Sequence, residues 1–186
     1  MKRALLIAFA ALAVACGGPQ APAGGAAVVN GDVVTTARYD LLVSSAKLRI
    51  ERSGVQQVDW ESARGRTQLG EIQAQALRLA VRDAVIEQLA RKRGVSVGDA
   101  DLDRALSALE SVSGGAQQLD QRLEQEGLTR AQYRTLLGDT LLDRELRAGD
   151  EQYDQHLADA LRRAGVRAYV GPCASDHEYP RCVDGR

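Results

Sequence analysis

The chain has 186 residues, of which 24 are lysine or arginine and 25 are aspartate or glutamate, so its formal net charge is −1. Hydrophobic residues make up 45% of the chain and aromatic residues only 4%. The hydrophobic share excludes a highly charged disordered protein, and the interleaved charges argue against the basic face that nucleic-acid binding requires. Few aromatic residues beside many Ala, Leu, Arg, Gln and Glu predict a mostly α fold around one globular domain.

The first fifteen residues have the features of an export signal. Met1-Lys2-Arg3 supplies a positive start, and the stretch from Ala4 to Ala15 is apolar or small throughout. This stretch is shorter than the roughly 20 residues that a membrane-spanning helix needs. It fits the apolar region of a signal peptide, so residues 1–15 are expected to be one.

Cys16 follows Ala13-Val14-Ala15, which resembles a bacterial lipobox with a lipid-bearing cysteine. Residues 16–25 are rich in Gly, Pro and Ala and would form a flexible tether. We therefore expect an extracytoplasmic lipoprotein, anchored through Cys16 on the periplasmic side of the inner or outer membrane. The alternative is an ordinary secretory signal cut elsewhere, with Cys16 incidental.

A short hairpin and a helix are predicted next. Two apolar runs, Ala27-Val28-Val29 and Val33-Val34, flank Asn30-Gly31-Asp32, and Asn-Gly between such runs is a strong hairpin signal. Thr36 is expected to cap a helix that ends near Ser53-Gly54. Apolar residues recur in it at spacings of three and four, which indicates one buried face.

A long helix is predicted from Arg66 to Arg93, after a polar loop that contains Trp60. Arg91-Lys92-Arg93 followed by Gly94 is typical of a helix end. At about 1.5 Å per residue this helix would be roughly 40 Å long. The residues expected to be buried where it meets a later helix are Leu79, Ile86, Leu137 and Leu141.

Shorter helices and a strand are predicted along the rest of the chain. The alternating stretch Val166–Val170 is expected to pair with the N-terminal hairpin, because an isolated strand is marginal in water. The predicted fold class is mostly α, with about six helices including one long central helix, and a small antiparallel sheet formed by the hairpin and this strand. The other helices are expected to begin at Asp99, to contain Leu119 and Leu123, to begin after Thr129, and to run from about Glu151 to Ala164.

Two cysteines lie in a polar tail, residues 171–186. Cys173 and Cys182 form an even pair, which in an exported protein is most simply a disulfide. Closing this loop would stabilise the tail by roughly 2 to 3 kcal/mol in the chain-entropy treatment. The alternative is a metal site that adds Asp176 and His177, but the cysteine spacing matches no zinc pattern, so we expect no metal.

The order and spacing of these elements resemble a known family. The motif Ala27–Val34, then Gly94-Val95-Ser96-Val97 after the long helix, and then Glu126-Gly127-Leu128-Thr129 with Tyr133, are similar to the N-terminal chaperone module of the SurA and PrsA type of extracytoplasmic foldase. The similarity covers roughly Ala26 to Leu146.

The resemblance implies a SurA-N-like helical chaperone domain over residues 26–170, in which 148–170 are the returning helix and strand. Members of the family usually carry a parvulin isomerase domain, for which there is no room between Leu146 and Glu151. The sequence also has no Gly-rich phosphate loop, Gly-x-Ser-x-Gly elbow or His-Glu-x-x-His helix. We therefore expect a non-enzymatic protein without catalytic residues or a cofactor. His156 is expected to be a solvated or partly buried helix residue, and His177 is expected to lie in the tail loop.

The function implied is an ATP-independent chaperone that binds unfolded or partly folded exported or outer-membrane proteins, with no small-molecule substrate. The alternatives are a lipoprotein adaptor that docks one fixed partner and an enzyme whose motif is not recognised. Trp60 is a candidate client-binding residue because it lies in a polar loop. Further candidates, which could instead complete the core, are Leu41, Leu48 and Leu77.

Overall fold

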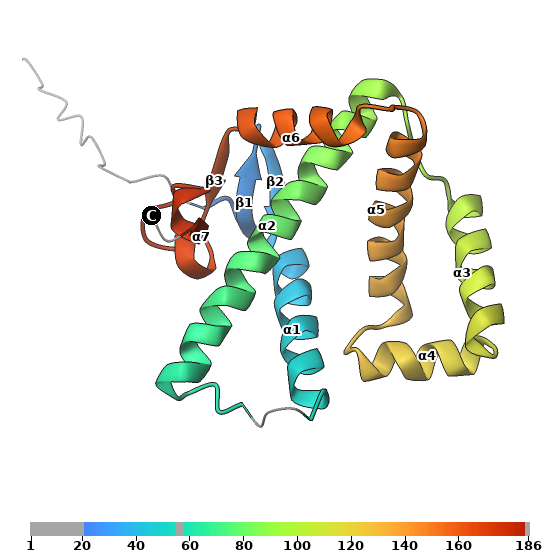
Figure 1. The fold of residues 1–186 in the computed structure, drawn as a ribbon, viewed down its shortest axis with the longest axis horizontal. Helices are drawn as coiled ribbons and strands as arrows, with labels where there is room; N and C mark the ends of the chain where they lie inside the picture. The colour runs from blue at the N-terminus through green and yellow to red at the C-terminus, as the bar shows by residue number, and fades with distance from the viewer. Residues whose placement is uncertain (1–20, 55–57, 185–186) are drawn as a thin grey trace, which may run out of the picture.

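The computed structural model describes residues 21–54 and 58–184. The expected signal peptide, Cys16 and half of the expected tether lie outside the described residues. Helices dominate the described chain, with one small sheet (Figure 1), so the predicted fold class is confirmed. In chain order the elements are β1 (Gly25–Val29), β2 (Asp32–Thr35), α1 (Thr36–Arg52), α2 (Ala63–Arg93), α3 (Asp99–Ser113), α4 (Ala116–Gln125), α5 (Arg130–Ala148), α6 (Tyr153–Arg163), β3 (Val166–Ala168), a 3-10 turn (Gly171–Cys173) and α7 (Arg181–Asp184).

The sheet is antiparallel, and β1 is its middle strand between β2 and β3. Asn30 and Gly31 both have positive φ angles in the turn between β1 and β2, as the Asn-Gly sequence predicts. Asn30 also accepts a hydrogen bond of 2.8 Å from the backbone N–H of Gly165, just before β3. The predicted pairing of the C-terminal strand with the hairpin is confirmed, although β3 ends at Ala168 and β1 already includes Gly25 of the expected tether.

Side-chain caps set the starts of α1, α2 and α5 within a few residues of the predicted positions. Thr35, rather than Thr36, caps α1. Ser62 caps α2 by accepting from the N–H of Gly65, so this helix begins three residues before the expected start. Thr129 starts α5 with a capping box, as predicted. A Cβ on Gly65 would lie 1.9 Å from the carbonyl oxygen of residue 59, so the preceding loop packs against α2 only because this residue is glycine.

The long helix α2 crosses the centre of the molecule and supplies much of the main core (Figure 1). It is covered by α1, the sheet, α6 and the C-terminal segment, so apolar residues on several of its sides are buried. The residues of α2 in this core are Ala76, Leu77, Ala80, Val81, Val85, Ile86 and Ala90. Ile86 is buried as predicted, but the expected burial of Leu79 is wrong.

Leu79 stays accessible because α5 crosses α2 at an angle. The two helices are joined further along α2, where Arg82 lies 3.0 Å from Asp143 of α5. Leu79 lines a cavity together with Tyr133 and Leu136 of α5.

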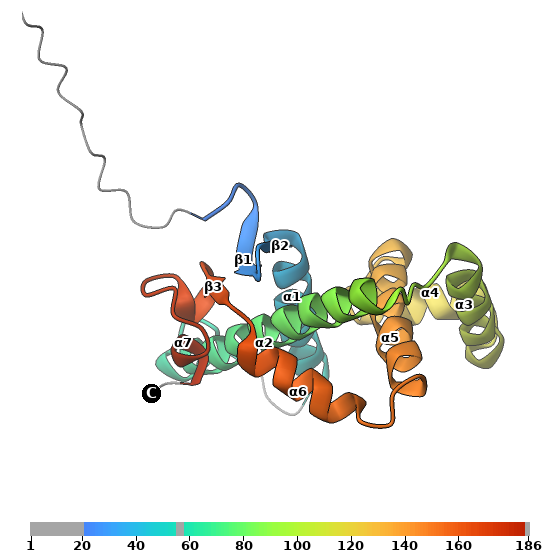
Figure 2. The same cartoon turned by 90° about the horizontal axis from the view of Figure 1, so that it is seen from above.

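A second, smaller core lies beyond α5. It consists of Leu119, Leu123 and Leu128, which belong to α4 and the α4–α5 loop. Figures 1 and 2 both show α3 and α4 at the end of the molecule opposite the C-terminal segment. We call α3, α4 and the α4–α5 loop the outer arm.

The C-terminal segment packs on the main core instead of extending as a tail. Cys173 is fully buried there. Arg78 of α2 donates a hydrogen bond of 3.0 Å to the carbonyl of Val183 and lies 3.5 Å from the carboxylate of Asp184. Among the helices of the described ranges, none is long and apolar enough to cross a membrane.

Candidate functional site

Two cavities lie between α1, α2 and the N-terminal half of α5, and Leu136 borders both. The hairpin cavity, of about 420 Å³, is also lined by β2, the start of α1 and the middle of α2. The loop cavity, of about 430 Å³, lies further along α1, beside the start of α2 and the α4–α5 loop. We call the two together the Leu136 groove. Apolar lining residues are Val33, Leu41, Ala80 and Ala84 in the hairpin cavity, and Leu42, Ile72, Leu79 and Tyr133 in the loop cavity.

The groove presents apolar side chains to solvent. Val33 in the hairpin cavity is 48% exposed, and Leu79 in the loop cavity is 37% exposed. Among the described residues, the other large apolar side chain with comparable exposure is Val112 on α3, which borders neither cavity. Accessible apolar side chains gathered in concave surface are characteristic of binding sites.

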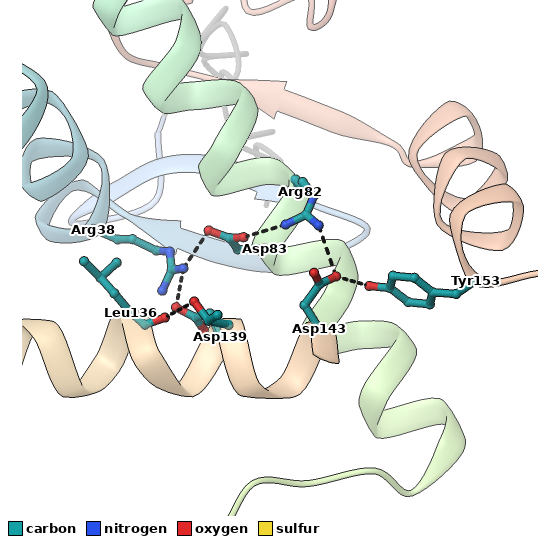
Figure 3. A network of polar contacts seen from close by, with 8 residues as sticks. Arg38, Arg82, Asp83, Leu136, Asp139, Asp143 and Tyr153 are labelled. Atoms are coloured by element: carbon teal, nitrogen blue, oxygen red, sulfur yellow. Dashed lines mark hydrogen bonds and ion pairs between the residues drawn. The ribbon is translucent and has the colours of Figure 1, made fainter. Parts of the chain in front are cut away.

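A buried arginine joins the three helices that form the groove (Figure 3). Arg38 of α1 donates hydrogen bonds of 2.8 Å to Asp83 of α2 and 2.6 Å to Asp139 of α5. All three side chains are less than one fifth exposed. The Nε atom of Arg38 is itself buried without a hydrogen-bond partner among the described residues. This cluster therefore fixes the middle of α5 against α1 and α2.

The same network extends to α6 (Figure 3). Asp143, one turn after Asp139, pairs with Arg82 of α2 and accepts a hydrogen bond from the hydroxyl of Tyr153. Burial is the main cause that raises the pKa of the Tyr153 hydroxyl, and its bond to Asp143 adds to this effect. Asp143 thus connects the second half of α5 to both α2 and α6.

Glu87 of α2 borders the hairpin cavity and, unlike Asp83 and Asp139, makes no ion pair within the described residues. Its side chain is half-buried, and no hydrogen bond or ion pair reaches its carboxylate within the described part of the chain. Burial raises the pKa of the Glu87 carboxyl, and the negative charge of Asp139 raises it further. Burial also raises the pKa of Asp139, against the hydrogen bond from Arg38. Of the charged residues that line the hairpin cavity, Asp32 and Glu87 are acidic and Arg38 is basic, so carboxylates exceed cations there.

The predicted client-binding leucines have three different environments. Leu41 borders the hairpin cavity and packs against the second core. Leu48 is partly buried against the α4–α5 loop, where a Cβ on Gly127 would come within 2.6 Å of it. Leu77 is fully buried in the main core, in agreement with the alternative that it completes the core, so it is not accessible to a client. The reason is that α2 is covered on several sides, which makes its core face wider than one apolar stripe.

Trp60 lies against the last turns of α1 and borders neither cavity. Its indole N–H donates a hydrogen bond of 2.7 Å to the carboxylate of Glu51. The ammonium of Lys47 lies 4.9 Å from the centroid of the ring. Trp60 thus attaches the α1–α2 loop to α1, and a role for it in binding clients stays a prediction.

The tail cysteines lie close together in the structure. The sulfurs of Cys173 and Cys182 are at bonding distance, with their Cα atoms 5.0 Å apart, which suits a disulfide. Within residues 21–54 and 58–184 there is no group of three or more His, Cys, Asp and Glu side chains arranged to hold a metal ion. His156 is exposed and pairs with Asp150, and His177 lies 3.0 Å from the carbonyl oxygen of Ala168.

The cluster of Arg38, Asp83 and Asp139 was not predicted from the sequence, although the spacing of the acidic residues can be seen there. Asp83 and Glu87 are four residues apart, as are Asp139 and Asp143, so each pair lies on one face of an apolar helix. A carboxylate on a buried face requires a partner. Arg38 could have been assigned as that partner, because it stands beside the buried Tyr39 at the start of α1.

Comparisons with known proteins agree with the fold. The family described as "SurA-like N-terminal domain" matches residues 3–147. The protein named Chaperone SurA from Salmonella typhimurium is 30% identical over 123 residues, which cover 66% of this chain and 27% of that protein. Chaperone SurA from Yersinia pestis is 29% identical over 123 residues, 66% of this chain and 26% of that protein. The matched segment thus spans about a quarter of the length of these relatives.

Proposed function

Because the chain belongs to the SurA-like N-terminal domain family, we propose that it is a chaperone that holds unfolded proteins in the Leu136 groove. The observation that carries this proposal is the exposure of Val33 and Leu79 inside the two cavities. An extended client can place apolar side chains in successive cavities, and burial of apolar surface stabilises such contacts by about 25 cal/mol per Å². The groove needs no nucleotide for this kind of binding.

Suppression of client aggregation tests the proposal. The protein should keep several unrelated unfolded proteins in solution without ATP. Leu79→Gln should reduce this activity per folded molecule, because it removes accessible apolar surface from the loop cavity. Val112→Gln is the matched control, since it changes an exposed apolar helix residue outside both cavities.

The same assay separates the chaperone from an adaptor. An adaptor would bind one fixed partner and leave unrelated unfolded proteins to aggregate. Equal loss of activity in Leu79→Gln and Val112→Gln would show that clients do not bind in the groove.

The proposed location is extracytoplasmic, with the protein tethered to a membrane by a lipid on Cys16. The lipobox-like sequence before Cys16 and the similarity to proteins named Chaperone SurA support this location. Cys16→Ser should release the folded protein from the membrane fraction. If the Cys16→Ser protein fractionates with membranes as the parent does, another anchor is responsible.

We also propose that the protein has no prolyl isomerase activity and acts by binding alone. This proposal is supported by the short connection from α5, which ends at Ala148, to α6, which begins at Tyr153. A peptide isomerisation assay should give the rate of a heat-treated control. A clear acceleration above that control would contradict the proposal.

A further inference from the structure

Among the described residues, one carboxylate of the hairpin cavity has no hydrogen-bond or ion-pair partner. Asp32 and Arg38 also border this cavity, but both are engaged by other side chains. Asp32 accepts a hydrogen bond of 2.9 Å from Gln88 and pairs with Arg91. Within the described residues nothing comparable reaches Glu87, so its carboxylate is the group available to a ligand.

The charge around Glu87 favours a cation. Arg38 faces two carboxylates, Asp83 and Asp139, which more than neutralise it. Arg91 also attracts the charge of Glu87, but its guanidinium pairs with Asp32, so Glu87 adds to a local excess of negative charge. The raised pKa values of Glu87 and Asp139 are consistent with this excess. Burial raises both, and a neighbouring carboxylate adds to each shift, Asp139 in the case of Glu87 and Asp83 in the case of Asp139.

The walls beside Glu87 are apolar. Ala80, Ala84 and Glu87 follow one another on one face of α2 at spacings of four and three. Leu41 of α1 and Leu136 of α5 border the same cavity. A side chain that fits here has a long apolar stem and a charged head, which describes lysine and arginine.

We propose that the hairpin cavity binds a lysine or arginine side chain of an unfolded protein, with its stem along Leu41 and Ala84 and its cationic head on Glu87. This inference rests on the proposed chaperone function and narrows it. The preferred clients are apolar segments that include a basic residue.

Two labelled peptides of the same apolar sequence test this preference, one with a central lysine and one with norleucine at that position. Their binding to the full chain is measured by fluorescence anisotropy. The parent should bind the lysine peptide about tenfold more tightly, as expected for a hydrogen bond between charged groups. Glu87→Gln should abolish the difference between the peptides. Glu151→Gln should preserve it, because this exposed residue before α6 undergoes the same change of charge away from the cavity.

The melting temperature of Glu87→Gln provides the control for folding. It should equal or exceed that of the parent, because the substitution removes a half-buried carboxylate without a partner. Equal binding of the two peptides by the parent overturns the inference, and so does a preference that survives Glu87→Gln. Equal binding would leave the chaperone function standing, whereas failure to bind either peptide or to suppress aggregation would overturn both.

Discussion

The main core and the core of the outer arm are stabilised to different extents. The main core joins the sheet, α1, α2, the end of α5, α6 and the C-terminal segment around a continuous set of buried residues. The core of the outer arm has three buried leucines, Leu119, Leu123 and Leu128. Because apolar burial is the largest favourable term in folding, we expect the outer arm to open at a lower free energy than the rest of the molecule.

The ion pairs also differ between the two regions, being buried beside the main core and exposed at the outer arm. Arg38 is only 16% exposed where it joins α1, α2 and α5. Arg130 and Arg134, by contrast, connect the start of α5 to the arm through exposed acidic residues such as Asp99 and Asp120. Exposed ion pairs contribute about 0 to 1 kcal/mol each. The loop cavity, which Leu128 of the arm helps to line, therefore lies between a firmly held wall and a weakly held one, which suits a site that must accept clients of different shapes.

Removing the charge of Arg38 should have the largest effect. Arg38→Met leaves Asp139 buried without its partner and Asp83 with only Arg82 at 3.7 Å, which costs about 3 to 5 kcal/mol. A buried carboxyl whose folded pKa is raised is destabilising while it is charged and loses this penalty as it becomes protonated. The gap in melting temperature between the variant and the parent should therefore narrow as the pH falls from about 7 to about 5. A gap that does not change with pH would exclude unpaired carboxylates as its cause.

Ile86→Ala tests the main core directly. Ile86 is 1% exposed, so its truncation should cost about 2 to 5 kcal/mol in the free energy of unfolding. Leu79→Ala, seven residues earlier on α2, is the control and should cost less, because Leu79 is accessible. Denaturant titrations measure both, and equal costs would mean that the loop cavity closes around Leu79 in solution.

Leu123→Ala tests whether the outer arm unfolds separately. Truncation should cost about 2 to 3 kcal/mol within the arm, at the low end for leucine because few residues surround it. Hydrogen exchange should become faster in α3 and α4 and stay unchanged in α2. Equal acceleration in α2 would show that the two cores unfold as one unit.

Reducing the cysteine pair of the C-terminal segment should have a smaller effect. Cys173 and Cys182 should be oxidised, and mass spectrometry of the unreduced protein should detect no free thiols in the tail. Reduction should lower stability by roughly 2 kcal/mol, since the closed loop is short. The far-UV circular dichroism of the helices should remain. Two free thiols in the native protein would contradict the assignment.

Trp60→Ala should change stability least, by about 1 kcal/mol, because the residue is half-buried and makes a single hydrogen bond to Glu51. Client holding should weaken if Trp60 contacts unfolded proteins, as the sequence predicts. Thermal melting and the aggregation assay measure the two effects separately. Unchanged holding per folded molecule would assign Trp60 to the attachment of its loop.

Most of the fold could be predicted because its signals are local. The Asn30-Gly31 turn, the Thr129 cap and the Gly94 stop each depend on residues close in sequence. The wrong predictions arise where distant elements decide the outcome. Leu77 and Leu79 are only two residues apart on α2, yet one is covered on all sides and the other faces a cavity. No periodicity within α2 shows where α5 will cross it.

The candidate site was predicted less completely for the same reason. Leu41 does border the groove, but Glu87 and Leu136 were not singled out, because their importance comes from meeting α1 across the cavity. Three segments far apart in sequence form this surface.

The position of β1 in the sheet also bears on the order of folding. The backbone N–H of Gly165 bonds to Asn30 across 135 residues of chain, so a chain that emerges N-terminus first exposes one edge of β1 until its last elements follow. An unpaired strand edge can add strands from other molecules. Completion of this domain must therefore wait for β3, and a chain that stops after α5 should be prone to aggregation through its first strand.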